Sequence, residues 1–342
     1  MLANSRSLKP GPALLRRVRS LAVLILFDSL IAVMPVLAES PPVPRVSHHQ
    51  HLVSPATVGL WGGETVPFDA AALVAQLDAA GIERAVVLSV AYSYGDERKR
   101  VENERERVRE ENDWTAAQVA RWPRRLIGFC SVNPLSSYAV EEIERCTRLS
   151  NMNGLKLHLG NGGVSLRNPA HAARLAEVFR VANTRRTPIV VHMRARTGTP
   201  YGADDATIFL NQVLPAAPDS VVQIAHLAGA GPGYPDYADA AFGVLADAVS
   251  MGDARTRNLY FDVTTVVTAG TTPENGALIA RRIRQVGIGR ILFGADLASG
   301  GNPPPRESWA IFREKIPLTD TEFAAIATSI APYIEVPHRS GL

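Results

Sequence analysis

The stretch Val46-Ser47-His48-His49-Gln50-His51-Leu52 begins a series of apolar, strand-like runs that continues almost to the end of the chain. In a strand, residues two positions apart point to the same side. His49 and His51 would therefore direct two imidazoles toward one point, at a spacing that allows both to bind one metal ion. A strand buried in a parallel sheet normally carries Val, Ile or Leu at such positions. Because a His-x-His pair also arises by chance, its meaning depends on the rest of the chain.

Seven more apolar runs follow, and segments with helical periodicity separate most of them. Short continuous apolar runs are typical of strands that are buried on both faces. We expect strands at 46–52, 85–90, 126–132, 154–159, 188–192, 221–226, 259–263 and 290–294. We expect helices at 68–80, within 96–122, and at 138–149, 169–182, 206–214, 237–251, 275–285, 309–315 and 319–331, whereas 53–67, rich in Gly and Pro, should be a long loop.

The ends of the later strands recur at a regular interval. His192, His226, Asp262 and Asp296 are separated in turn by 34, 36 and 34 residues. This period fits strand–loop–helix–loop units of a parallel sheet, and eight such units close into a barrel. A doubly wound open sheet would normally carry a glycine-rich turn after its first strand, where His-Gln-His stands here. The sequence therefore predicts an α/β protein with a (β/α)8 TIM-like barrel, with distortion allowed.

The first 38 residues have the pattern of a secretory signal. Arg16, Arg17 and Arg19 precede the mostly apolar run from Leu21 to Ala38, which ends in small residues. Asp28 interrupts that run, so an uncleaved membrane anchor is the alternative. We expect a signal peptide at 1–38, a proline-rich lead-in at 39–45, the barrel domain at 46–334 and a C-terminal tail at 335–342, in a periplasmic or secreted protein.

Charge and cysteine content limit the classes of partner. Residues 1–38 contain five Lys or Arg and one Asp, so their removal changes the net charge from +3 to −1. Nucleic-acid binding then loses its main support, and a membrane partner requires the uncleaved segment. We expect a small-molecule substrate, and the sequence leaves homo-oligomer formation open. Acids and bases alternate over 96–109, which indicates a solvated helix face. For Cys130 and Cys146 we expect two buried free thiols, with a disulfide as the alternative in an exported protein.

Polar side chains gather at the predicted strand ends, where barrel enzymes carry their chemistry. Six of the eight histidines lie in or at the end of a predicted strand. Together with one lysine and two aspartates, the polar residues at the strand ends are His48, His49, His51, Lys156, His158, His192, His226, Asp262 and Asp296. Neutral imidazole and carboxylate suit zinc, iron or manganese, and three histidines with one aspartate would hold one divalent ion with an open position. We expect zinc, whose bound water would have a pKa of ~7 and become hydroxide near neutral pH.

Several motifs resemble the amidohydrolase superfamily, in particular its amidohydrolase-related branch of distorted barrels. They are His49-Gln50-His51, Gly154-Leu155-Lys156-Leu157-His158, Val191-His192, Ala225-His226, Phe293-Gly294-Ala295-Asp296 and Ile330-Ala331-Pro332-Tyr333. The resemblance implies that His49, His51, His192 and Asp296 bind the metal. It also implies that His226 acts on the substrate or the attacking water, with Asp296 sharing the proton. Lys156 lies where binuclear relatives place a carboxylated lysine, but its Gly-x-Lys-x-His context resembles the mononuclear branch, so we expect an unmodified active-site lysine.

Other assignments keep two interpretations. Arg194, together with Arg196, could bind a substrate carboxylate or could be a solvated loop residue. His158 is a candidate for substrate binding or a residue that supports a ligand. Asp262 could act in catalysis or bond to a strand backbone, and His48 should face outward or cap the barrel. The leading function is a metal-dependent hydrolase of an amide, lactone or ester. The alternatives are a decarboxylase of an aromatic or enoic acid and a metal-binding barrel without turnover.

Overall fold

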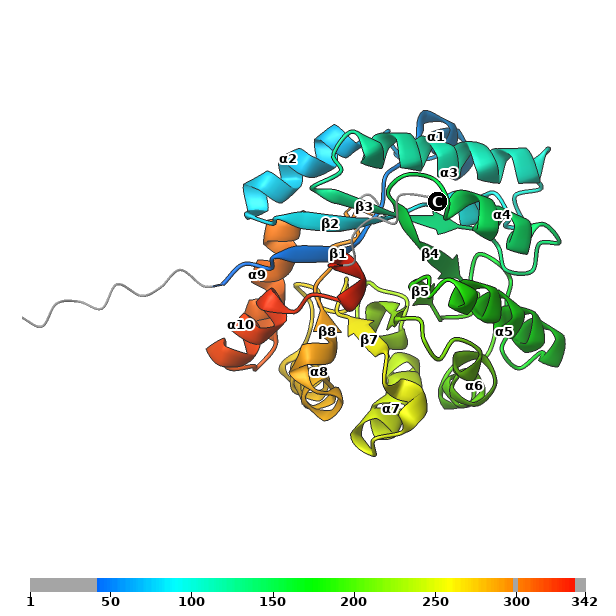
Figure 1. The fold of residues 1–342 in the computed structure, drawn as a ribbon. Helices are drawn as coiled ribbons and strands as arrows, with labels where there is room; N and C mark the ends of the chain where they lie inside the picture. Colours follow the sequence, from blue (N-terminus) through cyan, green and yellow to red (C-terminus); the bar gives the residue numbers. More distant parts are fainter. Residues whose placement is uncertain (1–41, 298–300, 336–342) are drawn as a thin grey trace, which may run out of the picture. The chain divides into compact units, whose positions relative to one another are not determined.

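Eight parallel strands, each paired with the next in sequence order, form the centre of the computed structural model, which describes residues 42–297 and 301–335 (Figure 1). They are β1 Val46–Gln50, β2 Arg84–Leu88, β3 Leu126–Ser131, β4 Met152–His158, β5 Ile189–His192, β6 Val222–Ile224, β7 Leu259–Asp262 and β8 Ile291–Leu292. Between the first and last strands, the amide of His48 donates to Phe293 O at 2.7 Å and the amide of Asp296 donates to His49 O at 2.9 Å. The predicted TIM-like barrel is confirmed, with a distorted closure at β1 and β8.

Helices surround the strands, as Figure 1 shows. They are α1 Pro55–Trp61, α2 Ala70–Ala80, α3 Glu104–Ala120, α4 Ala139–Cys146, α5 Pro169–Thr184, α6 Ala203–Ile208, α7 Asp236–Ser250, α8 Pro273–Val286, α9 Pro305–Lys315 and α10 Asp320–Thr328. A π-helical turn, Phe209–Val213, continues α6. None of these helices, which lie in the described ranges, is long and apolar enough to span a bilayer. The predicted signal peptide at 1–38 lies outside the described residues.

Helix α1 lies where we expected only a long loop. The Ser54 hydroxyl accepts a hydrogen bond from the amide of Thr57 at 3.0 Å, and Pro55 occupies the first helical position. Gly62 ends the helix with a φ of 70°. A serine cap followed by proline is a helix start signal. Here it outweighs the glycine content of the segment, and the prediction was wrong for these seven residues.

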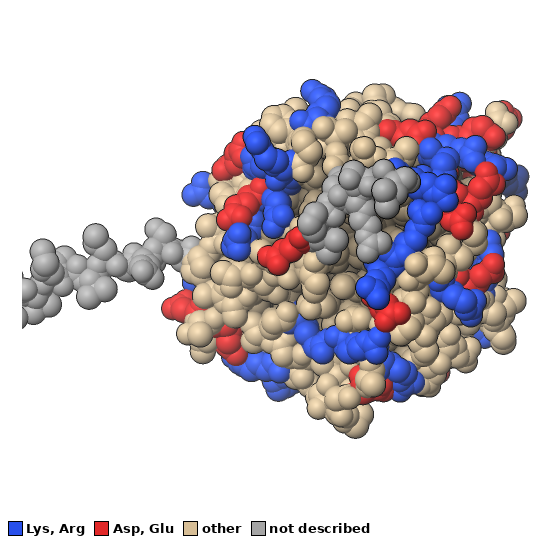
Figure 2. Space-filling model, in the orientation of Figure 1, with Lys and Arg blue, Asp and Glu red and all other residues tan. Residues whose placement is uncertain are grey.

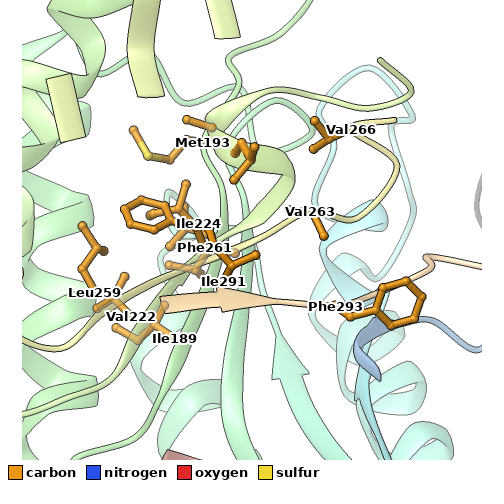
Figure 3. Packing of buried hydrophobic residues seen from close by; sticks show 14 of the residues in the cluster. Ile189, Met193, Val222, Ile224, Leu259, Phe261, Val263, Val266, Ile291 and Phe293 are labelled. Carbon is orange, nitrogen blue, oxygen red and sulfur yellow. The ribbon is translucent and has the colours of Figure 1, made fainter. Parts of the chain in front are cut away.

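The main hydrophobic core lies between the strands and the helices. Alternate strand residues such as Ile224, Phe261 and Ile291 point outward from the barrel and are fully buried. Figure 3 shows these three side chains packed side by side, with Met193 beside them. Burial of one such side chain contributes roughly 1.5–3 kcal/mol, so the helices are held mainly by this layer.

A second apolar cluster lies inside the barrel toward the amino-terminal ends of the strands. It contains Val46, Val86, Leu88, Phe129, Val190 and Leu292 together with Tyr333. Tyr333 belongs to η7 Pro332–Ile334, the last described helical turn, drawn in red in Figure 1. Its ring packs edge-on against Phe129, with 5.3 Å between centroids. This cluster closes one end of the barrel, so any site inside the barrel must lie toward the other end.

Cys130 and Cys146 form a disulfide with 6.0 Å between their Cα atoms, so our expectation of two free thiols was wrong. Cys130 lies on β3 and Cys146 at the end of α4, and both pack with Ala116 and Met152. The helix returns along the strand it follows and brings two residues 16 positions apart into contact. The spacing of the two cysteines in the sequence does not predict this contact, because the contact depends on how α4 packs on β3.

Ion pairs cover the outer surface. Arg105 and Arg109 of α3 both bind Glu141 of the neighbouring α4, at 2.5 and 2.7 Å. Figure 2 shows acidic and basic side chains close together around the face that it draws. The interpretation of the charged segment as a solvated, paired helix face is therefore confirmed for its α3 part.

Candidate metal centre

His49 of β1 and His51, the residue after the strand, lie side by side at its carboxyl-terminal end. Its register with β2 shifts between Ser47 and Gln50. Both imidazoles are buried, and their ring centroids lie 5.3 Å apart. Nδ1 of His51 lies 2.6 Å from Leu88 O, which can only accept, so Nδ1 must carry the proton. His51 therefore keeps the lone pair of Nε2 available.

Asp296 completes a group of three possible ligands. The ligand atoms of His49, His51 and Asp296 all lie within 4.8 Å of one another. Oδ1 of Asp296 is buried without a hydrogen-bond partner, and it lies 3.4 Å from Nε2 of His51. A buried, unpaired carboxylate oxygen is costly unless a cation or donor satisfies it. Two imidazole nitrogens and this oxygen are the donor types that suit zinc or manganese, so the residues present fit a divalent ion.

Asp262 also lies near two histidines, His49 and His226, within the same 4.8 Å limit. Its carboxylate already accepts four hydrogen bonds: from His49 Nδ1 at 3.1 Å, Gln223 Nε2 at 2.6 Å, the His226 amide at 3.0 Å and the Thr264 amide at 3.2 Å. A carboxylate with four donors has little capacity left for an ion. Burial alone would raise its pKa, but His49 and the other donors hold the pKa well below the usual range. Asp262 therefore holds the His49 ring through Nδ1 and offers no free oxygen of its own.

His226 follows β6 in an unusual turn. We expected a strand through this residue, but β6 ends at Ile224. His226, Leu227 and Ala228 all have positive φ angles, at 55°, 45° and 61°. Such residues cost free energy and cluster at functional sites. The His226 amide binds Asp262, and Nδ1 lies 2.9 Å from Thr264 O, so the ring presents Nε2 to the cluster.

His192 and His158 lie beside this group. Their rings stack with 3.8 Å between centroids, and the Tyr92 ring lies 4.8 Å from that of His158. His192 is 5.1 Å from the His226 ring but belongs to neither three-residue group described above. Nδ1 of His158 accepts from the Asn161 amide at 3.2 Å. The metal-binding role of His192 and the substrate-binding role of His158 stay predictions.

Lys156 brings a buried amino group into the same cluster. Its side chain is buried, and Nζ lies 3.3 Å from His49 Nε2. Burial lowers the pKa of Lys156 to about 8 and raises that of Asp296 to about 8, while each opposes the shift of the other. Burial and Lys156 together lower the pKa of His49 to about 3. His49 is therefore neutral at pH 7, which is the form that binds metal ions.

The two arginines after β5 are held by the protein. The guanidinium of Arg194 lies over the rings of Tyr201 and Tyr237, at 5.3 and 4.7 Å from their centroids. Arg196 binds Asp96 at 3.2 Å and the carbonyl of Asn161 at 3.3 Å. These contacts tie Arg196 to the loops that follow β2 and β4. The rings of Tyr201 and Tyr237 hold the guanidinium of Arg194. The role of Arg194 in binding a carboxylate stays a prediction.

His48 was expected to face outward or cap the barrel; it is fully buried, so it does not face outward, and it contacts Tyr333 at the closed end of the barrel. Nδ1 lies 3.2 Å from Phe293 O, and Nε2 accepts from the Ala331 amide at 3.2 Å. The ring is buried because the segment from Ala331 to Tyr333 packs over it, a contact between distant parts of the sequence. We also missed Gln223, although a polar residue inside the apolar run of β6 was a usable signal.

Position 294 has room only for glycine, since a Cβ on Gly294 would lie 2.6 Å from the Cβ of His49.

One cavity of about 490 Å³ lies between the loops after β7 and β8 and the start of α9. Its walls include Val263, Phe293, Ile311 and Phe312, and it shares Thr265 and Gly294 with the surroundings of the histidine cluster. Among the residues lining it there is no Lys, Arg or His. A volume of this size is typical of pockets for small organic molecules.

Comparison with known proteins agrees with this arrangement. Residues 46–329 match the family described as amidohydrolase, so the chain belongs to the amidohydrolase family. No curated protein matches it in sequence. The barrel is similar to 2,6-dihydroxybenzoate decarboxylase from Rhizobium, with 17% identity and a TM-score of 0.59 over 85% of this chain and 98% of that one.

Two further structures are similar. The 5-carboxyvanillate decarboxylase from Novosphingobium aromaticivorans, which holds manganese and 4-hydroxy-3-methoxy-5-nitrobenzoic acid, has 14% identity and a TM-score of 0.58 over 87% of this chain and 97% of that one. A probable 2-pyrone-4,6-dicarboxylic acid hydrolase from Acinetobacter baumannii has 15% identity and a TM-score of 0.52 over 84% and 96%. At these identities the likenesses establish the fold. The reaction has to be argued from the residues.

Proposed function

We propose that this amidohydrolase-family protein is a metal-dependent decarboxylase of a small aromatic acid. The observation that carries the proposal is the buried cluster in which Lys156 and the unpaired oxygen of Asp296 lie beside His49, His51 and His226. The similar barrels named for benzoate and vanillate decarboxylation support it, and one of them holds manganese with an aromatic acid. Decarboxylation, which was the alternative to hydrolysis in the sequence analysis, thus becomes the leading proposal.

The chemistry requires one bond to break and one proton to move. The bond between the carboxyl carbon and the ring carbon breaks, carbon dioxide leaves, and the ring carbon keeps the electron pair and takes a proton. A divalent ion bound by His49, His51 and Asp296, with His192 as a further candidate, would supply positive charge to hold the anionic substrate. Lys156 carries donor hydrogens in the cluster, so we assign it to pair with the carboxylate and to deliver the proton.

His226 is assigned the opposite role. Its Nδ1 proton is directed at Thr264 O, so the neutral ring can accept a proton at Nε2 but cannot donate one there. A hydroxyl group on the aromatic ring is a suitable partner for such an acceptor, because its oxygen can then feed electron density into the ring. Lys156 as donor and His226 as acceptor would hold two oxygens of one substrate.

The organic body of the substrate has a place in the cavity beside α9. Its walls are mostly apolar, and the lining residues include no cation to attract a carboxylate. We therefore place the aromatic ring toward Val263 and Phe293 and its carboxylate toward Lys156. The cavity adjoins the cluster through Thr265, whose Oγ1 lies 3.2 Å from His226 Nδ1, and through Gly294, which lies against the Cβ of His49.

Product analysis tests the reaction. The protein loaded with zinc or manganese would be given hydroxybenzoic acids, lactones and esters, with the chelator-treated protein as control. One carbon dioxide released for each acid consumed supports the proposal. Cleavage of a lactone or ester without carbon dioxide would establish the hydrolase instead, which the likeness to the probable pyrone dicarboxylate hydrolase favours. Bound metal without any turnover would indicate the non-catalytic barrel.

We also propose that residues 1–38 direct export. The basic and apolar pattern supports this, and so does the Cys130–Cys146 disulfide, because disulfides persist mainly in oxidising compartments. The mature protein should begin near Glu39. Amino-terminal sequencing of protein from the periplasm or medium checks the cleavage, and an intact terminus on a membrane-bound product would identify an anchor.

A further inference from the structure

A hydrogen-bonded chain links the closed end of the barrel to the candidate metal site. The Tyr333 hydroxyl lies 2.5 Å from Gln223 Oε1, and Gln223 Nε2 lies 2.6 Å from Asp262 Oδ2. The same carboxylate oxygen lies 3.1 Å from His49 Nδ1. We infer that Tyr333 is a positioning residue for the metal ligand His49 and acts through Gln223 and Asp262. This inference rests on the metal site of the proposed function.

The Asp262 carboxylate determines which atom donates in each of these three hydrogen bonds. Asp262 is ionised and can only accept, so Gln223 must turn its NH2 group toward it. The carbonyl oxygen of Gln223 then faces Tyr333, whose hydroxyl must donate. For the same reason His49 must carry its proton on Nδ1. The lone pair of Nε2 is thereby directed at the metal site, and a partner of this kind fixes both the tautomer and the ring orientation of a ligating histidine.

The four side chains joined by these hydrogen bonds are shielded from water, so each depends on its protein partners. His49, Gln223 and Asp262 are fully buried, and Tyr333 is 6% exposed. Bulk water therefore has poor access to any group that loses its partner, and a buried unpaired polar atom is costly. Without the Tyr333 hydroxyl, Gln223 Oε1 loses its donor, while Nε2 keeps Asp262 Oδ2 at 2.6 Å and His48 O at 3.4 Å. A buried oxygen without a donor favours a displaced amide, and a displacement of Gln223 disturbs the Asp262 carboxylate that holds His49.

A second contact from the same segment supports the assignment. The Ala331 amide donates to His48 Nε2, and His48 Nδ1 in turn lies 3.2 Å from Phe293 O. The Tyr333 and His48 rings lie 6.4 Å apart in an edge-on arrangement. The segment Ala331–Tyr333 thus holds the residue before His49 in the chain as well as the carboxylate that binds its ring. The carboxyl-terminal turn would then do more than close the barrel.

Metal affinity without substrate tests this inference. Zinc binding to the metal-free protein would be measured in competition with a chromogenic chelator, and the unfolding transition in urea would be recorded for each variant. We expect Tyr333→Phe to weaken zinc binding by about two- to tenfold, the effect of one hydrogen bond. Asp262→Asn should weaken it by about 10- to 100-fold, since the acceptor itself is changed.

Tyr234→Phe is the matched control. Tyr234 is also buried, and its hydroxyl donates to a carboxylate, that of Asp239, at 3.0 Å, outside this chain of bonds. We expect its zinc affinity to equal that of the unchanged protein. Equal zinc binding by Tyr333→Phe and the unchanged protein would overturn the inference. So would a loss shared by Tyr234→Phe, because that would reflect general destabilisation.

Nitrogen NMR of the histidine rings gives a readout that a purely structural role would not move. His49 should show the Nδ1–H tautomer in the metal-free protein, and Tyr333→Phe should change the chemical shift of Nδ1, because the displaced Asp262 carboxylate alters the hydrogen bond that it accepts. An unchanged His49 Nδ1 chemical shift in that variant contradicts the inference. These experiments use no substrate, so normal zinc binding without carbon dioxide release would overturn only the proposed decarboxylation.

Discussion

The two ends of the barrel interior differ in composition although the same strands build both. On β5, Val190 lies in the apolar cluster and His192, two residues later, lies in the polar cluster. On β7, Tyr260 packs against the apolar cluster and Asp262 binds His49. Residues two apart share a face, so a single strand supplies both environments. The amino-terminal end supplies packing, and the carboxyl-terminal end supplies ligands and proton carriers.

Non-glycine residues with positive φ occur before strands, as at Asn151 and Arg186, and also after strands, within the polar cluster. His226, Thr265 and Asp296 are non-glycine residues with positive φ, and all three follow a strand at the carboxyl-terminal end. Their φ angles are 55°, 54° and 54°. Each such residue costs free energy that the surrounding contacts must offset. For His226 the Asp262 carboxylate provides part of that compensation. At these three positions of the polar end, the geometry of the cluster therefore costs local stability.

The largest combined effect, on metal content and turnover together, should come from Asp296→Asn at the polar end. Asparagine keeps the size and tolerates the left-handed backbone, but it removes the charge. Bound metal should fall well below one equivalent. Turnover should drop on the order of 10³-fold, since loss of the ion costs several kcal/mol and each ~1.4 kcal/mol is tenfold. Metal analysis and kinetics check this, and full metal content with normal turnover would contradict it.

His226→Ala should separate catalysis from metal binding at the same end. We expect metal near one equivalent, because His226 is assigned to the substrate. Turnover should fall ~10²–10⁴-fold, the usual range for general acid–base help. His192→Ala is the companion variant, with loss of metal expected. The roles are reversed if His226→Ala loses metal while His192→Ala keeps it.

Leu292→Ala should affect the apolar end. Leu292 is fully buried in the inner cluster, so its truncation leaves a cavity. The free energy of unfolding should fall by ~2–5 kcal/mol. Because the side chain makes no polar contact with the metal site, kcat at 25 °C should stay within about twofold. Urea unfolding and kinetics together check this, and a large loss of kcat with little loss of stability would break the contrast between the ends.

Ile311→Trp should affect substrate binding at the polar end without touching the ligands. Ile311 lines the cavity beside α9, and the larger side chain would fill part of it. We expect KM for the aromatic acid to rise by roughly tenfold, corresponding to ~1.4 kcal/mol of lost binding, with metal content unchanged. Unchanged KM would show that the ring is bound elsewhere.

The smallest effect should come from Glu322→Gln on the outer surface, away from both ends. Arg284 and the Thr319 cap lower the pKa of Glu322 to about 2. A lowered carboxyl pKa stabilises the fold above the unfolded value of 4.5, and this contribution is lost as the pH falls toward 2. The variant should thus show a slightly lower urea midpoint at pH 7, and the difference should shrink below pH 4.5. A difference that grows in acid would contradict the assignment.

The sequence by itself determined the barrel and most of the polar cluster. Continuous apolar runs reveal strands buried on both faces, and a regular spacing of polar strand ends reveals which end of the barrel carries them. Both are local patterns, so His49, His51, His226, Lys156 and Asp296 could be named without a structure. Their assigned roles remain predictions for experiment.

Tertiary structure alone decided which of these residues touch and what holds them. The Asp262–His49 bond joins β7 to β1, and the Tyr333–Gln223 bond joins the carboxyl-terminal turn to β6. The cysteine pair and the buried place of His48 likewise depend on how elements pack. Such contacts link residues far apart in the chain through angles and distances that no local sequence pattern encodes.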